Sequence, residues 1–209
     1  MVRLTELEHD ALVELFNIGV GQAASAMSEI VNETVTMSVP AISFLTRAAA
    51  AKLLDSRSSG NGRICGISQH YSGAFETEAI LMFPEEKSQE IVRLMVGEAI
   101  TQDELSAMEQ EAMSEIGNIL LNSCVGSLAN LLGHELHGSL PDYHVGYSEE
   151  ILAQAGSGET AVLMLHIEFI IERHQIVGDV AFIMDMTALH DLKQHVANFL
   201  DRSIGGVQP

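Results

Sequence analysis

The sequence is poor in cysteine, proline and basic side chains. Its two cysteines, Cys65 and Cys124, fit no zinc-ligand spacing and lie in apolar segments, which predicts buried, unreactive thiols and a reducing compartment. Only four prolines occur and no stretch has low complexity, so a disordered chain is excluded. Ten Lys and Arg face 29 Asp and Glu, and the formal charge of −19 excludes nucleic-acid binding, because few cations are available to replace phosphate counterions.

Long apolar runs are also missing. The longest one, residues 161–171, contains His166 and Glu168 and is much shorter than the roughly 20 residues of a membrane span. Charged residues stand near the N-terminus, where a secretion signal would have its apolar stretch. Since 47% of the residues are apolar and 19% are charged, we expect a cytoplasmic, globular protein without membrane insertion.

The two halves of the sequence repeat each other. Displacing the sequence on itself by 101 residues superimposes a long helical pattern, a proline and an apolar strand on their counterparts, as expected of an internal duplication. The aligned positions are Glu14 with Glu115, Asn17 with Asn118, Pro40 with Pro141, and 79–83 with 180–184.

Each half predicts a long amphipathic helix, a strand at the proline, a short helix, two strands joined by a turn, and a closing helix. Thr5 is the expected N-cap of the first helix, with Glu8 at capping-box distance, and Gly133 is the expected end of the second long helix. The expected bounds are 5–31, 34–44, 47–55, 62–71, 74–83 and 85–97, then 103–132, 136–146, 148–155, 160–171, 175–184 and 186–200.

These elements predict an α+β fold in one domain, residues 1–209. Two repeats, about 1–100 and 101–200, would share one β-sheet under a pseudo-two-fold axis, with the long helices packed beside it and a short C-terminal tail.

Each long helix should carry an apolar stripe and a polar stripe at about 100° per residue. The residues expected to face inward are Leu12, Phe16, Gly19, Ala23, Met27 and Ile30, and Met113, Gly117, Leu120, Cys124, Leu128 and Leu131. Those expected to face outward are Asp10, Glu14, Asn17, Gly21, Ser25 and Ser28, and Glu111, Glu115, Asn118, Asn122, Gly126 and Ala129.

The polar stripes do not have the composition of an ordinary solvated helix face. Both contain Asn and Gly, which are poor helix formers. A Glu and an Asn three residues apart project from the same side of the helix, and small residues such as Gly21 and Ser25 follow them. We therefore expect a shallow surface across which a helix of another protein can lie.

This pattern resembles the signature of the CheC, CheX and FliY chemotaxis phosphatases, which reads Asp or Ser, x3, Glu, x2, Asn, x22, Pro. The first copy fits at every position, with Asp10, Glu14, Asn17 and Pro40. The second copy departs at its first position, with Glu111, Glu115, Asn118 and Pro141. The resemblance covers both halves and implies a CheC-like fold.

The resemblance also implies a function, an enzyme that accelerates hydrolysis of the phospho-aspartate of a CheY-like response regulator. Asn17 and Asn118 would hold the attacking water in line, and Glu14 and Glu115 would engage the lysine of the receiver's active site. The Mg²⁺ of the reaction would belong to the receiver, so no metal or cofactor of this chain is expected. Partner contacts are implied for Asp10, Gly21, Ser25 and Glu111, and a role in shaping the adjoining strands for Pro40 and Pro141.

A second function stays open at this point. The chain can be a non-catalytic interaction module that binds a CheD-like receptor deamidase or another flagellar or chemotaxis partner, as the resemblance permits. Two weaker signals are discounted. His134 and His137 straddle a helix end and lack a third ligand, and the glycines of Gly19-x-Gly21-x-x-Ala24 lie within a helix, where they cannot form a dinucleotide-binding turn.

Overall fold

The fold was obtained as a computed structural model, which describes residues 4–31, 33–57, 62–73, 76–96, 101–133, 135–153, 160–171 and 174–205. The helices are α1 (Glu6–Val31), α2 (Arg47–Arg57), α3 (Glu85–Val96), α4 (Gln102–Leu132), α5 (Ser148–Ala153) and α6 (Met186–Gly205). The strands are β1 (Val35–Thr46), β2 (Ile64–Gly73), β3 (Thr77–Pro84), β4 (Leu136–Gly138), β5 (Asp142–Gly146), β6 (Thr160–Ile171) and β7 (His174–Asp185).

Two element predictions are wrong. The single strand expected over 136–146 is broken into β4 and β5, because the chain leaves the ladder between Gly138 and Asp142. The last helix continues to Gly205, five residues beyond its expected end, and the remainder of the expected tail lies outside the described residues.

Local capping signals fix the ends of the long helices. The backbone N–H of Thr5 donates to Glu8 Oε2 at 2.6 Å, and the N–H of Glu8 donates to Thr5 Oγ1 at 3.2 Å, which is the predicted capping box of α1. Helix α4 has a similar box between Thr101 and Glu104, and it ends at Gly133 in the left-handed conformation. A glycine adopts that conformation at little cost.

All strands join one antiparallel sheet in the order β1-β6-β7-β3-β2-β4, with β5 also paired to β2. The hairpins β2–β3 and β6–β7 meet in the centre, where β3 pairs with β7. The first strand of each repeat pairs with the hairpin of the other repeat, β1 with β6 and β4–β5 with β2. This arrangement confirms the predicted α+β fold with a shared sheet.

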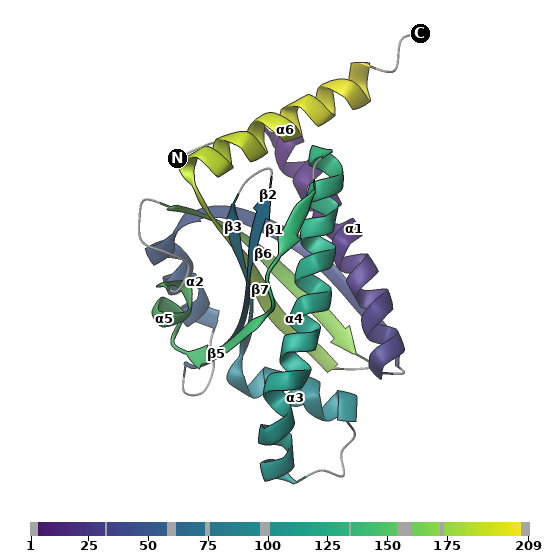
Figure 1. The fold of residues 1–209 in the computed structure, drawn as a ribbon, viewed down its shortest axis with the longest axis vertical. Coiled ribbons are helices and arrows are strands. Elements are labelled where there is room, and N and C mark those ends of the chain that lie inside the picture. Colours follow the sequence, from purple (N-terminus) through teal and green to yellow (C-terminus); the bar gives the residue numbers. More distant parts are fainter. Residues whose placement is uncertain are drawn as a thin grey trace.

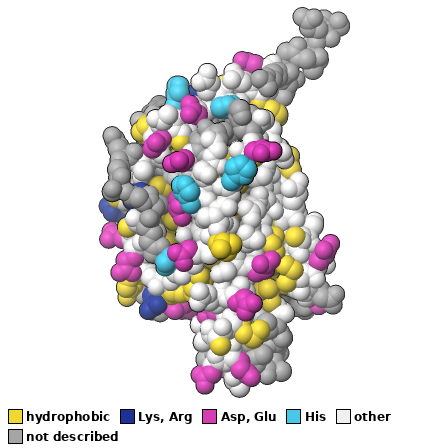
Figure 2. All heavy atoms as spheres, in the orientation of Figure 1, with side chains coloured by type: hydrophobic (Ala, Val, Ile, Leu, Met, Phe, Trp, Pro, Cys, Tyr) yellow, Lys and Arg dark blue, Asp and Glu magenta, His cyan; other side chains and the backbone are white. Residues whose placement is uncertain are grey.

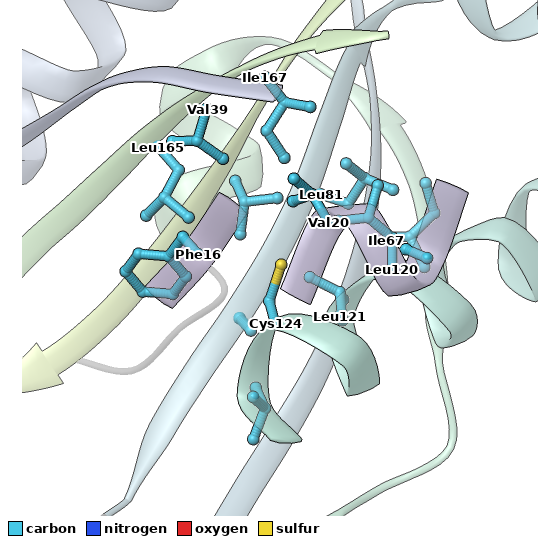
Figure 3. Packing of buried hydrophobic residues seen from close by; sticks show 14 of the residues in the cluster. Phe16, Val20, Val39, Ile67, Leu81, Leu120, Leu121, Cys124, Leu165 and Ile167 are labelled. Carbon is cyan, nitrogen blue, oxygen red and sulfur yellow. The ribbon is translucent and has the colours of Figure 1, made fainter. Parts of the chain in front are cut away.

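The long helices α1 and α4 run antiparallel, side by side, on one face of the sheet, and α2 and α5 cover part of the other face (Figure 1). The larger core lies between the sheet and the long helices and contains residues such as Phe16, Leu81 and Leu165 (Figure 3). A smaller core lies beneath α2 and α5. Within the described ranges, no helix combines the length and apolar character needed to cross a membrane.

The two cysteines are free and fully buried, as predicted. Burial raises the pKa of both thiols, Cys65 and Cys124, to about 12. An unfolded cysteine has a pKa of about 8.5, so at pH 8 the native chain should hold roughly a thousand times less thiolate.

We therefore expect a thiol reagent such as DTNB to label neither cysteine in the native protein at pH 8 and both of them in denaturant. Because the pKa values of both thiols are raised in the folded state, their contribution to the free energy of unfolding is fully present below about pH 8.5. This contribution falls as the pH rises toward the folded pKa values. Rapid labelling of one thiol without denaturant would contradict this prediction.

Candidate functional site

The exposed face of α1 carries most of the predicted contact residues. Asp10, Glu14, Gly21 and Ser25 are all exposed, and a Cβ added at Gly21 would meet no atom within 4 Å. Within the part of the chain that the structure describes, the Glu14 carboxylate has no hydrogen bond or ion pair. This face therefore offers an uncompensated carboxylate above a smooth surface.

Asn17 lies at the border of this face and is bonded to strand β1. Its Nδ2 donates to the carbonyl oxygens of Val13 at 2.9 Å and Val39 at 3.3 Å, and its Oδ1 accepts from the N–H of Val39 at 2.8 Å. The carboxamide thus bonds both backbone polar groups of Val39. We expected the Asn17 side chain to project freely from the helix, and it does not.

The partner of Asn17 lies in a β-bulge. Ser38 pairs with Glu168 and Ala41 with His166, so Val39 and Pro40 together face a single residue of β6. Proline has no N–H for the ladder, and the extra residue of a bulge is left without a ladder partner. The Asn17 carboxamide replaces the missing partner of Val39.

The bulge also restores the burial pattern of β1. Val35 before the bulge, Val39 within it and Ile42 after it all point into the larger core. An insertion of one residue is required because side chains alternate between the two faces of a strand. Figure 3 shows Val39 beside Leu165 in this core.

The predicted polar stripe of α1 therefore serves two surfaces. Ser28, three turns beyond Asn17, also bonds β1, since its Oγ accepts from the N–H of Val35 at 3.0 Å. Asn17 and Ser28 tie the helix to the strand, whereas the remaining members of the stripe face solvent. The prediction for Ile30 was wrong, because this side chain is 44% exposed where α1 approaches its end.

Helix α4 presents the second copy of the pattern. Glu111 and Glu115 are exposed, and neither carboxylate has a hydrogen-bonding partner among the described residues. Asn118 is half-buried, and its Oδ1 accepts from Gln69 Nε2 at 3.2 Å and from Asn122 Nδ2 at 2.8 Å. The two asparagines of the motif are thus held by different groups, backbone at Asn17 and side chains at Asn118.

Gln69 and Tyr71 support Asn118 from strand β2, and both are 1% exposed. Gln69 Nε2 also donates to the carbonyl oxygen of Ser139 at 2.9 Å. The Tyr71 hydroxyl lies 3.0 Å from Gln69 Oε1 and 3.0 Å from Asn122 Oδ1. Burial raises the pKa of the Tyr71 phenol far above its ordinary value, so the hydroxyl keeps its proton and acts as a donor in this network.

The backbone beside Asn118 differs from that beside Asn17. Pro141 lies in the gap between β4 and β5, and Leu140, which corresponds to Val39, is 89% exposed, whereas Val39 is 1% exposed. At the second site the side chain before the proline, Leu140, therefore lies in solvent, whereas at the first site the corresponding side chain, Val39, lies in the core.

Acidic charge dominates around both sites. Helices α1 and α4 each contain five Asp or Glu and neither Lys nor Arg. Figure 2 shows scattered acidic and few basic side chains on the face that includes α4. No group of three or more His, Cys, Asp or Glu suited to a metal ion occurs in the described ranges.

Gln69, Tyr71 and Leu140 lie outside the sequence motif, and none of them was predicted as a site residue. A glutamine within an apolar strand pattern is the one local signal, because buried polar side chains need partners. Those partners lie 49 residues away at Asn118 and 70 residues away at Ser139, and no local pattern connects them.

The chain is similar to several known proteins. Residues 7–44 match the CheC-like family. The chain is 25% identical over 199 residues to the CheY-P phosphatase CheC of Bacillus subtilis (strain 168), an alignment that spans 92% of this chain and 88% of that protein.

Two solved structures share the fold. FliY of Thermotoga maritima matches with a TM-score of 0.74 at 20% identity, over 95% of this chain and 100% of that chain. The FliM middle domain from H. pylori matches with a TM-score of 0.63 at 11% identity, over 92% and 99% of the two chains. These likenesses confirm the resemblance to the CheC-like family that the sequence predicted.

Proposed function

We propose that this chain accelerates hydrolysis of the phospho-aspartate in a CheY-like receiver domain, using one site on α1 and one on α4. The observation that carries the proposal is a repeated pair, Glu14 with Asn17 and Glu115 with Asn118. In each pair the Glu is exposed and has no partner among the described residues, and the Asn lies one turn further along the helix. The likeness, over 92% of this chain, to a protein named as a CheY-P phosphatase supports it.

The chemistry needs little from this protein beyond positioning. A receiver holds its acyl phosphate beside Mg²⁺ and a lysine, and water attacks the phosphorus in line. The lysine supplies the cation that α1 and α4 lack, and a charge-assisted bond from it to Glu14 or Glu115 would fix the helix over the phosphate. The neighbouring Asn would then order the water, a contribution that comes from orientation.

The exposed surfaces near both pairs suit a docked helix. Gly21 on α1 and Gly126 on α4 have no atom within 4 Å of an added Cβ, so a partner can approach the helix backbone there. Asp10 and Glu111 lie one turn before the Glu of each pair and would contact the rim of the receiver.

The test is the decay of a Mg²⁺-loaded, phosphorylated CheY-type receiver with and without this protein. The double variant Glu14→Ala, Glu115→Ala should lose roughly 10- to 100-fold of the acceleration, because a lost bond to a charged group costs about 1.5–3 kcal/mol. Its thermal stability should stay unchanged, since both carboxylates are exposed and unpartnered among the described residues.

The matched control replaces two exposed acids outside the long helices, Glu86→Ala with Glu149→Ala. This control removes the same charge and should keep full activity. Equal activity of both double variants, or no acceleration by the unsubstituted chain, would refute the proposal.

The second candidate is a non-catalytic module that binds a CheD-like deamidase or another chemotaxis partner. One observation favours it, namely that the Asn17 carboxamide is already engaged by Val39, which gives the Asn and Pro of the first copy of the motif a purely structural reason. Capture of such a partner by a chain that leaves receiver decay unchanged would support this candidate.

A further inference from the structure

Gln69 is a buried side chain in strand β2 that contacts Asn118, Ser139 and Tyr71. We propose that Gln69 is a positioning residue of the second phosphatase site, which fixes the orientation of the Asn118 carboxamide. This inference rests on the proposed function. It assigns a role to a residue that lies outside the sequence motif and on a different element.

A backbone carbonyl group determines which way the Gln69 amide is oriented. The Ser139 carbonyl oxygen can only accept, so it faces the N–H₂ end of Gln69, at 2.9 Å. The same Nε2 lies 3.2 Å from Asn118 Oδ1, and the other end of Gln69 is held by the Tyr71 hydroxyl. With Nε2 directed at Asn118, only the oxygen of the Asn118 carboxamide can face Gln69.

The opposite end of Asn118 is consequently available. Its Oδ1 accepts from both Gln69 and Asn122, which occupies two lone pairs. Its Nδ2 donates to no group in the described part of the chain. Asn118 therefore presents an N–H₂ donor, a group suited to the oxygen atoms of a phosphoryl group or of the attacking water.

The first site is built in the opposite sense. Asn17 Nδ2 donates to two carbonyl oxygens, and its Oδ1 accepts one N–H, so its remaining capacity is that of an acceptor. The residue that supports it is part of β1 and cannot be changed without altering the bulge. Of the two sites, the second is the one supported by a side chain, Gln69, that a mutation can remove. The first site of the same molecule therefore serves as the comparison.

The experiment measures receiver dephosphorylation in a Glu14→Ala background, where the second site alone works. Gln69→Met, which keeps the length and removes both amide groups, should lower kcat by roughly 10- to 100-fold, because Asn118 loses its fixed orientation. KM should change less than twofold, because Glu115 and the docking surface stay intact. Asn122→Ala, an exposed position, should reduce kcat in the same direction by a smaller factor.

The first site is the control for a general structural effect of the Gln69 substitution, because both sites belong to one chain. In a Glu115→Ala background, where the first site alone works, Gln69→Met should leave kcat within twofold. The strand variant Gln175→Met, at an exposed position of β7 that pairs with Ile170, should change neither site. Equal losses in the two backgrounds, or a rise in KM at constant kcat, would overturn the assignment.

A spectroscopic readout separates this inference from the proposed function. The side-chain amide signal of Asn118, identified by its loss in Asn118→Ala, should shift or broaden in Gln69→Met, while that of Asn17 stays in place. An unchanged Asn118 signal would overturn the positioning role whatever the activity. If the unsubstituted chain accelerates no decay while the Asn118 signal does respond, the proposed function fails and the Gln69–Asn118 contact stands.

Discussion

An Asn17→Ala chain is expected to lose about 2–3 kcal/mol of unfolding free energy. The substitution leaves the N–H and the carbonyl of Val39 without their side-chain partners at a residue that is 1% exposed. Each buried polar group left unsatisfied costs about 1–3 kcal/mol, and partial access of water at the half-buried Asn17 reduces the sum. Chemical denaturation followed by circular dichroism measures the loss.

Asn118→Ala is the matched control for this prediction. It removes bonds to Gln69 and Asn122, and Gln69 keeps its bonds to Ser139 and Tyr71, so the expected loss is about 1 kcal/mol or less. Equal stabilities of the two variants would contradict the role of Asn17 in the bulge. The difference also means that a loss of activity in Asn17→Ala cannot by itself be assigned to chemistry, which is why the Glu variants give the sharper functional test.

Gly19→Ala and Gly21→Ala are expected to change stability in opposite directions, although they lie two residues apart on α1. A Cβ at Gly19 would lie 2.9 Å from the carbonyl oxygen of Ser123 and 3.2 Å from Cys124 Cα, both of them backbone atoms of α4. The long helices would have to separate, at a cost of about 1–3 kcal/mol. At Gly21 nothing lies within 4 Å, so alanine should add about 0.5–1 kcal/mol by its helix propensity.

The same pair of variants tests the contact surface. If a receiver helix lies against Gly21, then Gly21→Ala should weaken docking and raise KM in the phosphatase assay while it stabilises the free protein. A Gly19→Ala chain as stable as the unsubstituted one, measured by thermal unfolding, would show that the crossing of α1 and α4 tolerates a wider spacing.

Much of the fold could be predicted because its signals are local. The capping box of Thr5 and Glu8 spans one helical turn, and Gly133 ends α4 by its own backbone conformation. Apolar periodicity placed Phe16 and Leu120 in the core, since a helix must bury the side that faces the sheet. The recurrence of the motif in the second half further implied that the strands share one sheet.

The missed features depend on contacts between distant residues. Helical periodicity puts Asn17 on the polar side of α1, but its role depends on a bulge 22 residues away, and nothing local predicts that bulge except Pro40. The proline at the same place in the second repeat accompanies a broken strand instead. Similar motif residues therefore have different surroundings, and Leu140 is exposed where Val39 is buried.

The exchange of first strands between the repeats also constrains how the chain is made. Strand β1 is synthesised before its partner β6, with which it pairs from Val35 opposite Ile171 onward. During synthesis β1 must wait with an open edge until the ribosome has delivered most of the second repeat, and pairings this distant in sequence form slowly. Neither repeat can complete its sheet alone, so the nascent first half is the stage at which this protein most needs protection from aggregation.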